Sequence, residues 1–228
     1  MQIEGRKLLA ELVGTFALTF IGSMSAAMAV EGFGGGGGAG VAVAALGHGL
    51  ILTVMVYALG GISGCHINPA VTLALAVAGK FPRRGVVPYL IAQLAGGTLA
   101  GLFHKWVRPL GPSSFGATLP APDVADGTVV LLEAVLTFFL VTAVFGAAVS
   151  KKAPAGFHGL AIGFALGASI LAGGAITGAS LNPARSFGPA LASLNFTAHW
   201  AYWVGPIVGG LVAAVVALVV QDFGAQRE

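Results

Sequence analysis

The stretch "GCHINPAVTLALAVAG" (Gly64–Gly79) begins a helix that is too short for its apolar surroundings. Asn68 suits the N-cap and Pro69 suits the first helical position, so a helix starts there. About ten mostly apolar residues follow. At about 1.5 Å per residue they span roughly 15 Å, half of a bilayer core of about 30 Å. The stretch "GASLNPARSFGPALAS" (Gly178–Ser193) repeats this construction.

The composition is that of an integral membrane protein. Of the 228 residues, 57% are hydrophobic and 8% are charged, whereas a soluble domain carries about 25% charged residues. Six apolar runs are each near the roughly 20 residues that a spanning helix needs. They are Leu8–Val30, Val41–Ile62, Val86–Val107, Thr128–Val149, Phe157–Ile176 and Trp200–Val220. The first run is longer than the core of a signal peptide, so we interpret it as a span. We expect an all-α membrane protein with six transmembrane helices in the lipid bilayer.

The distribution of charge predicts the orientation. The net charge of +3 does not indicate nucleic-acid binding, because the basic residues lie in short loops between spans. With six spans, one side of the membrane receives Arg6, Lys7, Lys80, Arg83, Arg84, Lys151, Lys152 and Arg227. The other side receives two basic residues, Lys105 and Arg108, together with the acidic Glu31, Asp123 and Asp126. The positive-inside rule then places both termini in the cytoplasm.

The chain contains an internal repeat. "ISGCHINPAV" aligns with "ITGASLNPAR", which places Asn182 on Asn68, 114 positions earlier. "YLIAQLAGGTLA" aligns with "YWVGPIVGGLVA", and "ELVGTFAL" aligns with "EAVLTFFL", which pairs Glu11 with Glu133. We divide the single membrane domain, residues 1–228, into a first repeat of about 1–108, a linker of about 109–127 and a second repeat of about 128–228. Three spans per repeat is an odd number, so the second repeat is inverted in the membrane.

Inversion explains the two short helices. They enter from opposite faces, and their Asn-Pro-Ala ends, residues 68–70 and 182–184, meet near the midplane, where inverted repeats with broken helices place a functional site. The residues of these ends are Asn68, Pro69, Ala70, Asn182, Pro183 and Ala184. Irregular backbone before each Asn is tolerated only if it is buried or lines a water-filled cavity. Its N–H groups need acceptors, and we expect Glu11 and Glu133 to be these structural buried acceptors.

The chemistry of the meeting point favours neutral solutes. Two helix N-termini create a positive zone, and Asn68 and Asn182 each offer an amide donor. Arg185 is an arginine within the membrane, which is costly and by default functional. A cation about 4 Å from it is repelled by roughly 4 kcal/mol at an effective dielectric constant of about 20. We therefore expect a bore that passes small neutral molecules and excludes protons and ions.

Two further residues belong to the first of these loops. Cys65 lies three residues before Asn68, in the stretch that we expect to line the bore. His66 is expected to brace the loop rather than to bind a metal. The sequence contains no metal-ligand cluster and no cofactor motif, so we expect neither a metal nor a cofactor.

Two functions compete on these observations. One is a passive channel for water and small neutral molecules. The other is a coupled secondary transporter, which also uses inverted repeats and would need Glu11 or Glu133 as a titratable carboxylate. An enzyme is not favoured, because no nucleophile–base pair stands out in the sequence.

"SGCHINPAVT" and "GASLNPARSFGPAL" resemble the paired signature of the aquaporin family, and the resemblance covers nearly the whole chain. It implies six helices with two half-helices, a homotetramer, and one pore per subunit. It also implies a selectivity filter with one residue from the second span, one from the fifth and two from the second half-helix loop. In this sequence they are His48, Ile170, Ala179 and Arg185.

The filter set with His48 and Ile170 resembles that of the tonoplast intrinsic aquaporins, which commonly pass water with ammonia, urea or hydrogen peroxide. We expect ammonia to exchange hydrogen bonds with His48. Ser186 after Arg185, and the pair Tyr202-Trp203, depart from the glycerol-conducting pattern and disfavour glycerol. The short termini resemble those of prokaryotic members, so we expect the cell membrane rather than a vacuole.

Overall fold

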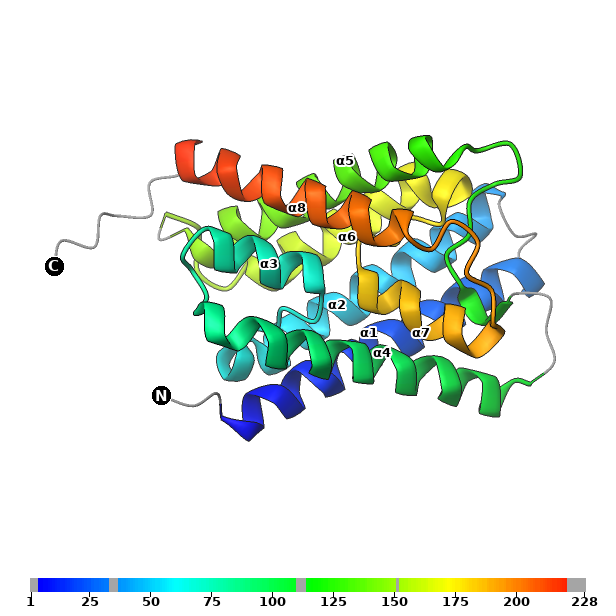
Figure 1. Ribbon diagram of the computed structural model, residues 1–228, viewed down its shortest axis with the longest axis horizontal. Helices are drawn as coiled ribbons and strands as arrows, with labels where there is room; N and C mark the ends of the chain where they lie inside the picture. Colours follow the sequence, from blue (N-terminus) through cyan, green and yellow to red (C-terminus); the bar gives the residue numbers. More distant parts are fainter. Residues whose placement is uncertain (1–3, 33–36, 110–113, 151, 221–228) are drawn as a thin grey trace, which may run out of the picture.

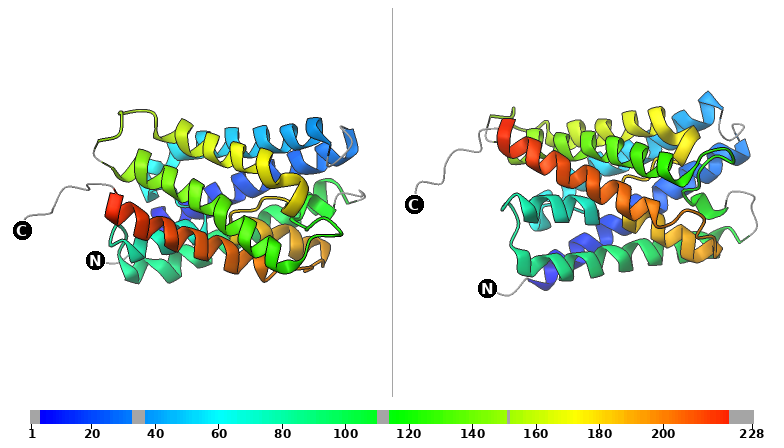
Figure 2. Two further views of the ribbon diagram at one scale, coloured as in Figure 1. Left: turned by 90° about the horizontal axis from the view of Figure 1, so that it is seen from above. Right: turned by 45° about the horizontal axis from the view of Figure 1, so that its top comes forward.

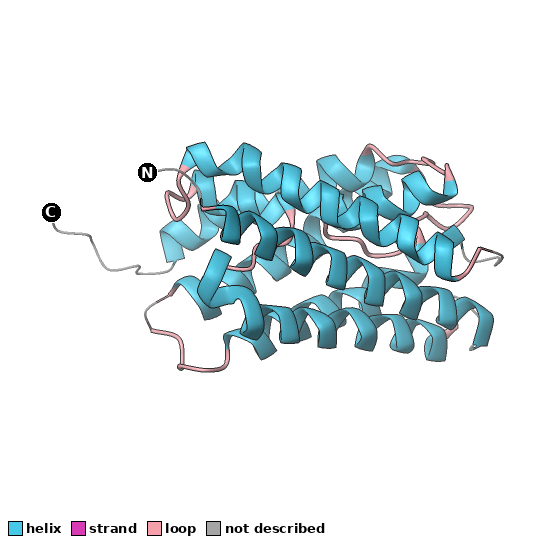
Figure 3. Cartoon of the chain, turned by 90° about the horizontal axis from the view of Figure 1, so that it is seen from below, coloured by secondary structure: helices cyan, strands magenta, loops and turns pink. Residues whose placement is uncertain are grey.

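Helices joined by loops and turns make up the part of the chain that the computed structural model describes, which is residues 4–32, 37–109, 114–150 and 152–220 (Figure 1). The helices are α1 (Gly5–Gly32), α2 (Gly38–Ser63), α3 (Pro69–Val77), α4 (Val86–Val107), α5 (Asp126–Val144), α6 (His158–Thr177), α7 (Pro183–Ser193) and α8 (Ala201–Val220). Short 3₁₀ turns occur at η1 (Arg83–Gly85) and η2 (Ser114–Gly116), and α5 continues into a π turn, η3 (Phe145–Val149). Within these ranges there is no strand (Figure 3). The predicted all-α class is confirmed.

Six of the helices are long and apolar enough to cross a membrane: α1, α2, α4, α5 with η3, α6 and α8. The predicted run Val86–Val107 has the same bounds as α4, and the other runs differ from their helices by a few residues at the ends. Large apolar side chains such as Leu46, Phe139 and Phe164 are more than half exposed on the outside of the bundle. Such a surface suits hydrocarbon and not water.

The two short helices enter the bundle from opposite ends. In Figure 1, α3 lies at the end where the chain termini are drawn and α7 lies toward the other end. Each begins with Asn as N-cap and Pro in the first turn. The Asn68 side chain accepts from the Ala70 amide at 2.9 Å, and the Asn182 side chain accepts from the Ala184 amide at 3.0 Å. The helices have nine and eleven residues, so together they make one composite span.

Each half-helix packs against the last span of the other repeat, α3 against α8 and α7 against α4. Two glycines at equivalent positions of the repeats allow this approach. A Cβ on Gly97 would lie 2.3 Å from the carbonyl oxygen of Ala184, and a Cβ on Gly210 would lie 3.1 Å from that of Ala70. Each half-helix is therefore held by a span of the other repeat, and these contacts fix the N-terminal ends of both half-helices in the middle of the bundle.

The beginning of α1 and the end of α8 lie at the same end of the bundle (Figures 1 and 2). This agrees with an even number of spans. The basic residues Lys151 and Arg227, and residues 110–113 of the predicted linker, lie outside the described residues.

Candidate pore and selectivity site

Two cavities follow each other along the inside of the bundle. A cavity of about 250 Å³ is lined by the half-helix loops and by parts of α2, η3 and α6; its wall includes Cys65, His66, Asn68, Asn182 and His158. A cavity of about 180 Å³ lies on the other side and is lined by α1, α2, α6 and the linker. His48 and Arg185 line both cavities. These two side chains therefore form the boundary between the inner and the outer cavity.

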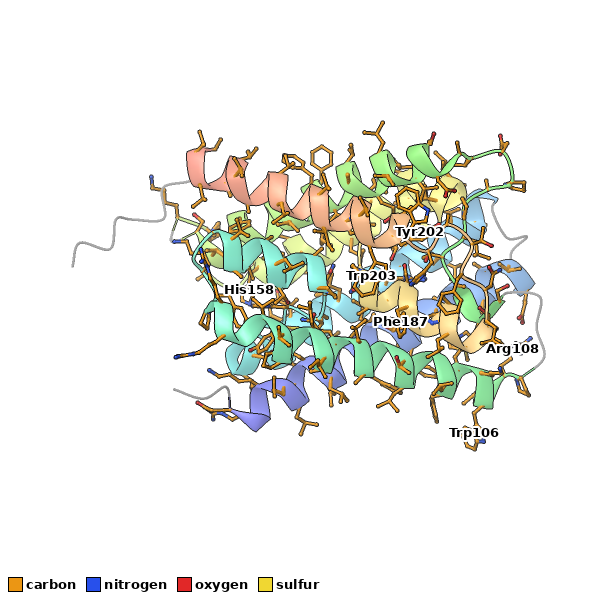
Figure 4. All side chains as sticks on the ribbon, viewed as in Figure 1. Trp106, Arg108, His158, Phe187, Tyr202 and Trp203 are labelled. Carbon is orange, nitrogen blue, oxygen red and sulfur yellow. The ribbon has the colours of Figure 1, made fainter. Side chains whose placement is uncertain are left out.

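The two cavities lead toward opposite ends of the molecule. His158 lies toward the end at which α1 begins (Figure 4), whereas the smaller cavity is lined by Val30 near the end of α1 and by Gly40 near the start of α2, at the opposite end. Because His158 lines the larger cavity, we call that cavity inner and the smaller one outer.

The asparagines connect the two half-helices. Nδ2 of Asn68 donates to the carbonyl of Leu181 at 2.8 Å, and Nδ2 of Asn182 donates to the carbonyl of Ile67 at 2.8 Å. Each side-chain oxygen is occupied by its own helix N-terminus. One N–H of each amide is thus used across the repeat boundary, and both residues also line the inner cavity. The sequence does not reveal these cross-repeat bonds.

Glu11 accepts hydrogen bonds from the first half-helix loop. Its carboxylate accepts from Ser63 Oγ at 2.7 Å, His66 N at 2.9 Å, Ile67 N at 2.7 Å and Gln93 Nε2 at 2.7 Å. The carboxylate is completely buried. An ionised carboxylate survives burial when it is saturated with hydrogen bonds, and here the bonds fix the loop.

Glu133 has the same role in the second repeat. Its carboxylate accepts from Thr177 Oγ1 at 2.8 Å, Ser180 N at 2.9 Å and Leu181 N at 2.8 Å. The loops need this support because they contain non-glycine residues with left-handed φ. These are Cys65 (47°), Ile67 (41°), Ala179 (42°) and Leu181 (57°). Each such residue costs roughly 1–2 kcal/mol. Neither carboxylate lines the inner or the outer cavity.

The boundary between the cavities is a hydrogen-bonded pair. Nε of Arg185 donates to Nε2 of His48 at 3.1 Å, and Nη1 of Arg185 donates to the carbonyl of Gly116 at 3.0 Å. The other imidazole nitrogen, Nδ1, bonds the carbonyl of Ala44 at 2.8 Å. Since a carbonyl only accepts, Nδ1 carries the proton and Nε2 is the acceptor. Both ring nitrogens have protein partners, so the expectation that His48 freely exchanges hydrogen bonds with ammonia is wrong for this structure.

Two glycine contacts set the position of this pair. A Cβ on Gly22 would lie 2.3 Å from Cδ2 and Nε2 of His48, so the imidazole lies directly against the backbone of α1. A Cβ on Gly116 would lie 2.3 Å from the carbonyl oxygen of Ser23, so the linker also lies directly on α1. The His48 ring and the linker residue Gly116, which both bond Arg185, thus pack directly against α1.

The other two predicted filter residues are placed differently from each other. Ile170 is buried and lines the outer cavity beside Arg185. Ala179 is buried but lines neither cavity, and its methyl group faces the position of Gly173 on α6. Gly178, the preceding residue, lines the outer cavity instead. The structure therefore brings His48, Ile170 and Arg185 together and leaves the Ala179 side chain in the protein.

Cys65 and His66 both line the inner cavity. His66 Nδ1 lies 3.1 Å from Thr72 Oγ1, and its ring packs against the rings of Phe81 and Tyr89 at centroid distances of 4.7 and 5.1 Å. One edge of the imidazole thus braces the loop while the residue also forms part of the cavity wall. The described residues contain no group of three or more His, Cys, Asp and Glu that could hold a metal ion.

Part of the linker belongs to the site, although the sequence does not predict it. Gly116 supplies a carbonyl to Arg185, and Thr118 Oγ1 lies 2.7 Å from Oγ of Ser186, the residue after Arg185. These contacts join residues almost 70 positions apart in the chain, and no motif or spacing signals them.

Six spanning helices, two Asn-capped half-helices and a cationic constriction between two cavities define an α-helical membrane channel with inverted repeats. The chain belongs to the major intrinsic protein family, whose family model matches residues 2–217. It is therefore a multi-pass membrane protein of a family of passive channels for water and small solutes, and the predicted resemblance to aquaporins is confirmed.

Three relatives illustrate the similarity. The chain is 45% identical to aquaporin TIP4-4 of Zea mays, over 92% of this chain and 84% of that protein. It is 41% identical to aquaporin AqpM of Methanothermobacter marburgensis, over 92% of this chain and 95% of that protein. Among solved structures, it is similar to the aquaglyceroporin from Plasmodium falciparum with a TM-score of 0.80 and 26% identity, covering 94% and 96% of the two chains.

Proposed function

We propose that this channel passes water and ammonia and excludes protons and other ions. The observation that carries the proposal is the constriction formed by His48 and Arg185, which divides the inside of the bundle into two cavities. A solute that crosses the protein passes this pair and then the two Asn side chains. We propose Ile170 as the apolar wall of the same constriction, and Asn68 and Asn182 as donors at the midplane.

Ammonia is proposed because Arg185 offers free N–H donors, whereas both ring nitrogens of His48 already have protein partners. A guanidinium has five N–H donors, and the side chain uses Nε and one N–H of Nη1 for protein partners in the described chain. The remaining donors suit a solute that accepts through a lone pair, as ammonia and water do. Urea and hydrogen peroxide also present acceptor oxygens and are the next candidates. Glycerol passes slowly on this proposal, because its carbon backbone has only Ile170 as an apolar wall.

Ion exclusion rests on charge and desolvation together. The guanidinium of Arg185 and the N-termini of α3 and α7 are positive toward the pore, and an arginine and the positive ends of half-helices form electrostatic barriers of this kind in aquaporins. A cation meets this repulsion and also loses hydration between apolar walls. A small neutral solute meets neither cost.

Transport is proposed to be passive. A coupled transporter would place a titratable carboxylate against the solute. Glu11 and Glu133 lie outside both cavities, and each accepts hydrogen bonds from two backbone amides of its own half-helix loop. They suit the role of scaffold for the loops.

We also propose that the chain forms a homotetramer with one pore per subunit, and that it lies in the cell membrane with both termini in the cytoplasm. The orientation is supported by Arg6, Lys7, Arg83 and Arg84, which lie at the beginnings of α1 and α4 or just before them. The tetramer is supported by the resemblance of the chain to aquaporins.

Stopped-flow light scattering of proteoliposomes tests the proposed solutes, with water, ammonia, urea and glycerol supplied in turn and no gradient other than that of the solute. We expect water and ammonia fluxes well above those of protein-free vesicles, a smaller urea flux, and glycerol near the background. An ammonia flux equal to the background would make the protein a plain water channel. A flux that requires a proton or sodium gradient would revive the transporter.

A further inference from the structure

The linker turn that holds Arg185 has an unusual backbone. Ser114, Phe115 and Gly116 have φ values of 46°, 55° and 67°, so three successive residues are left-handed. Only glycine adopts this conformation without steric cost. A left-handed Phe persists only where its surroundings determine it, so contacts around Phe115 must hold the turn.

Two consecutive residues of α4 make those contacts. The His104 ring meets the Phe115 ring edge to face, with centroids 5.8 Å apart and an angle of 75°. Nζ of Lys105 lies 5.9 Å from the centre of the same ring and donates to the carbonyl of Ala192 at 2.9 Å. The Phe115 ring is thus packed against the outer end of α4, and Lys105 also joins this end of α4 to the end of α7 by a hydrogen bond.

His104 is in turn fixed by α1. Its side chain is completely buried, and Nδ1 lies 3.1 Å from Oγ of Ser23. The Ser23 carbonyl is the atom against which Gly116 lies. A polar side chain buried in a membrane helix is expensive unless it has a function or a partner, and neither His104 nor Ser23 lines a cavity.

These contacts bear on Arg185, because the turn that they hold bonds its guanidinium. The last carbonyl of the turn, that of Gly116, is one of the two side-chain partners of Arg185 in the described structure. Moving the turn by a fraction of an ångström would lengthen or remove this bond. The guanidinium would then be held by His48 alone and would adopt further rotamers.

We propose that Ser23, His104 and Phe115 are positioning residues for Arg185, and that they set which solutes pass without touching a solute. This inference rests on the proposed function, in which Arg185 is part of the filter. With the turn loosened, the constriction is wider on average, and urea gains more than water because urea is the larger solute.

The test is the ratio of urea to water permeability in proteoliposomes that contain equal amounts of assembled protein. Phe115→Ala removes the ring that packs against His104 and Lys105. His104→Phe keeps a ring but removes Nδ1, the partner of Ser23. Ser23→Ala removes only the hydroxyl that bonds His104. We expect each to raise the ratio by roughly threefold or more, because residues in contact are energetically coupled and each change reaches Arg185 through the turn. An unchanged or lower ratio overturns the proposal. If Phe115→Ala does not assemble, Phe115→Leu and Ser23→Ala decide by the same criterion.

Matched control variants come from the same helices. Trp106→Ala truncates an aromatic side chain on α4 that is 75% exposed and points away from the bundle (Figure 4). Ser25→Ala removes a hydroxyl from α1 that donates to the carbonyl of Ile21 in its own helix. Both controls should keep the parental ratio. A rise as large as that of Ser23→Ala in the control Ser25→Ala would mean that any loosening of α1 has this effect, and the proposal would fail.

A double-mutant cycle separates this inference from the proposed function. In an Arg185→Val background the turn has no guanidinium to hold, so Phe115→Ala should leave the ratio unchanged. The same rise in that background would show that the turn acts by another route and would overturn the inference. If Arg185→Val alone leaves solute selectivity unchanged, the proposed function of Arg185 fails. If Arg185→Val changes the selectivity and Phe115→Ala does not, only the further inference fails.

Discussion

Nε of Arg185 donates a 3.1 Å hydrogen bond to Nε2 of His48, and this bond joins a half-helix of the second repeat to a span of the first. The bond holds a cationic guanidinium and a neutral imidazole together at the point where the two cavities meet. It also explains why Nδ1 of His48 must carry the ring proton, since Nε2 accepts from a guanidinium that is always a donor. The properties of the constriction should therefore respond to changes in either residue.

Removing the guanidinium should weaken the exclusion of charge. We expect Arg185→Val to keep water flux and to admit more cations, because the variant removes the one full positive charge that lines both cavities in the described structure. The N-terminal ends of α3 and α7 stay positive, so exclusion weakens and does not vanish. Cation conductance of oocytes or vesicles measures the leak. An unchanged leak with normal expression would remove Arg185 from the barrier.

The solute range should follow the ring residues. The double change His48→Phe with Ile170→His replaces the imidazole with a larger ring and adds a polar side chain on α6, so the new side chains fill the constriction and compete for the free N–H groups of Arg185. We expect water flux to stay within about one order of magnitude, or about 1.4 kcal/mol of barrier, and ammonia flux to fall sharply. Stopped-flow measurements with both solutes provide the comparison. Ammonia flux that survives the double change would contradict the role of these two residues.

The contact between Gly22 and His48 predicts a narrowing variant. In Gly22→Ala the new Cβ would lie 2.3 Å from the imidazole, which is closer than carbon atoms pack. The ring must therefore shift away from α1, toward Arg185 and the pore. We expect water flux per assembled channel to fall by about tenfold, equivalent to roughly 1.4 kcal/mol. Gly5→Ala, at a glycine of α1 with open space around it, is the control. Equal fluxes in the two variants would show that the ring can move elsewhere.

Cys65 offers a chemical test of the inner cavity. Because it lines this cavity and is the only cysteine of the chain, a mercuric salt should block water flux, and Cys65→Ser should abolish the block. Mass spectrometry establishes whether the thiol is labelled. Full water flux in the labelled protein would show that mercury bound to Cys65 does not close the pore.

The carboxylates should be needed for their acceptor oxygens. Glu133→Gln keeps one oxygen, which can still accept from Thr177 and Ser180, and loses the acceptor for the Leu181 amide. Glu133→Leu leaves all three donors unpaired, at about 1–3 kcal/mol for each. Gln should therefore assemble with reduced thermal stability, whereas Leu should misfold, as size-exclusion chromatography in detergent would show. A Gln variant that assembles normally but loses a pH-driven flux would favour the transporter.

The sequence by itself determined the membrane class, the six spans and the half-helices starting at Asn68 and Asn182. These features follow from local rules: apolar length against bilayer thickness, Asn-Pro as a helix start, and an internal repeat that pairs Glu11 with Glu133. Each is visible within a window of some 20 residues or by comparing two such windows. For the same reason the sequence could identify the loops whose buried N–H groups need acceptors.

Only the tertiary structure decided how the constriction is built. It shows that His48 has both ring nitrogens occupied, that Ala179 faces protein, and that the linker carbonyl of Gly116 holds Arg185. These contacts join segments far apart in the chain and depend on distances of a few tenths of an ångström. No periodicity or spacing encodes them, because they arise where close packing of several helices determines which side chains can meet.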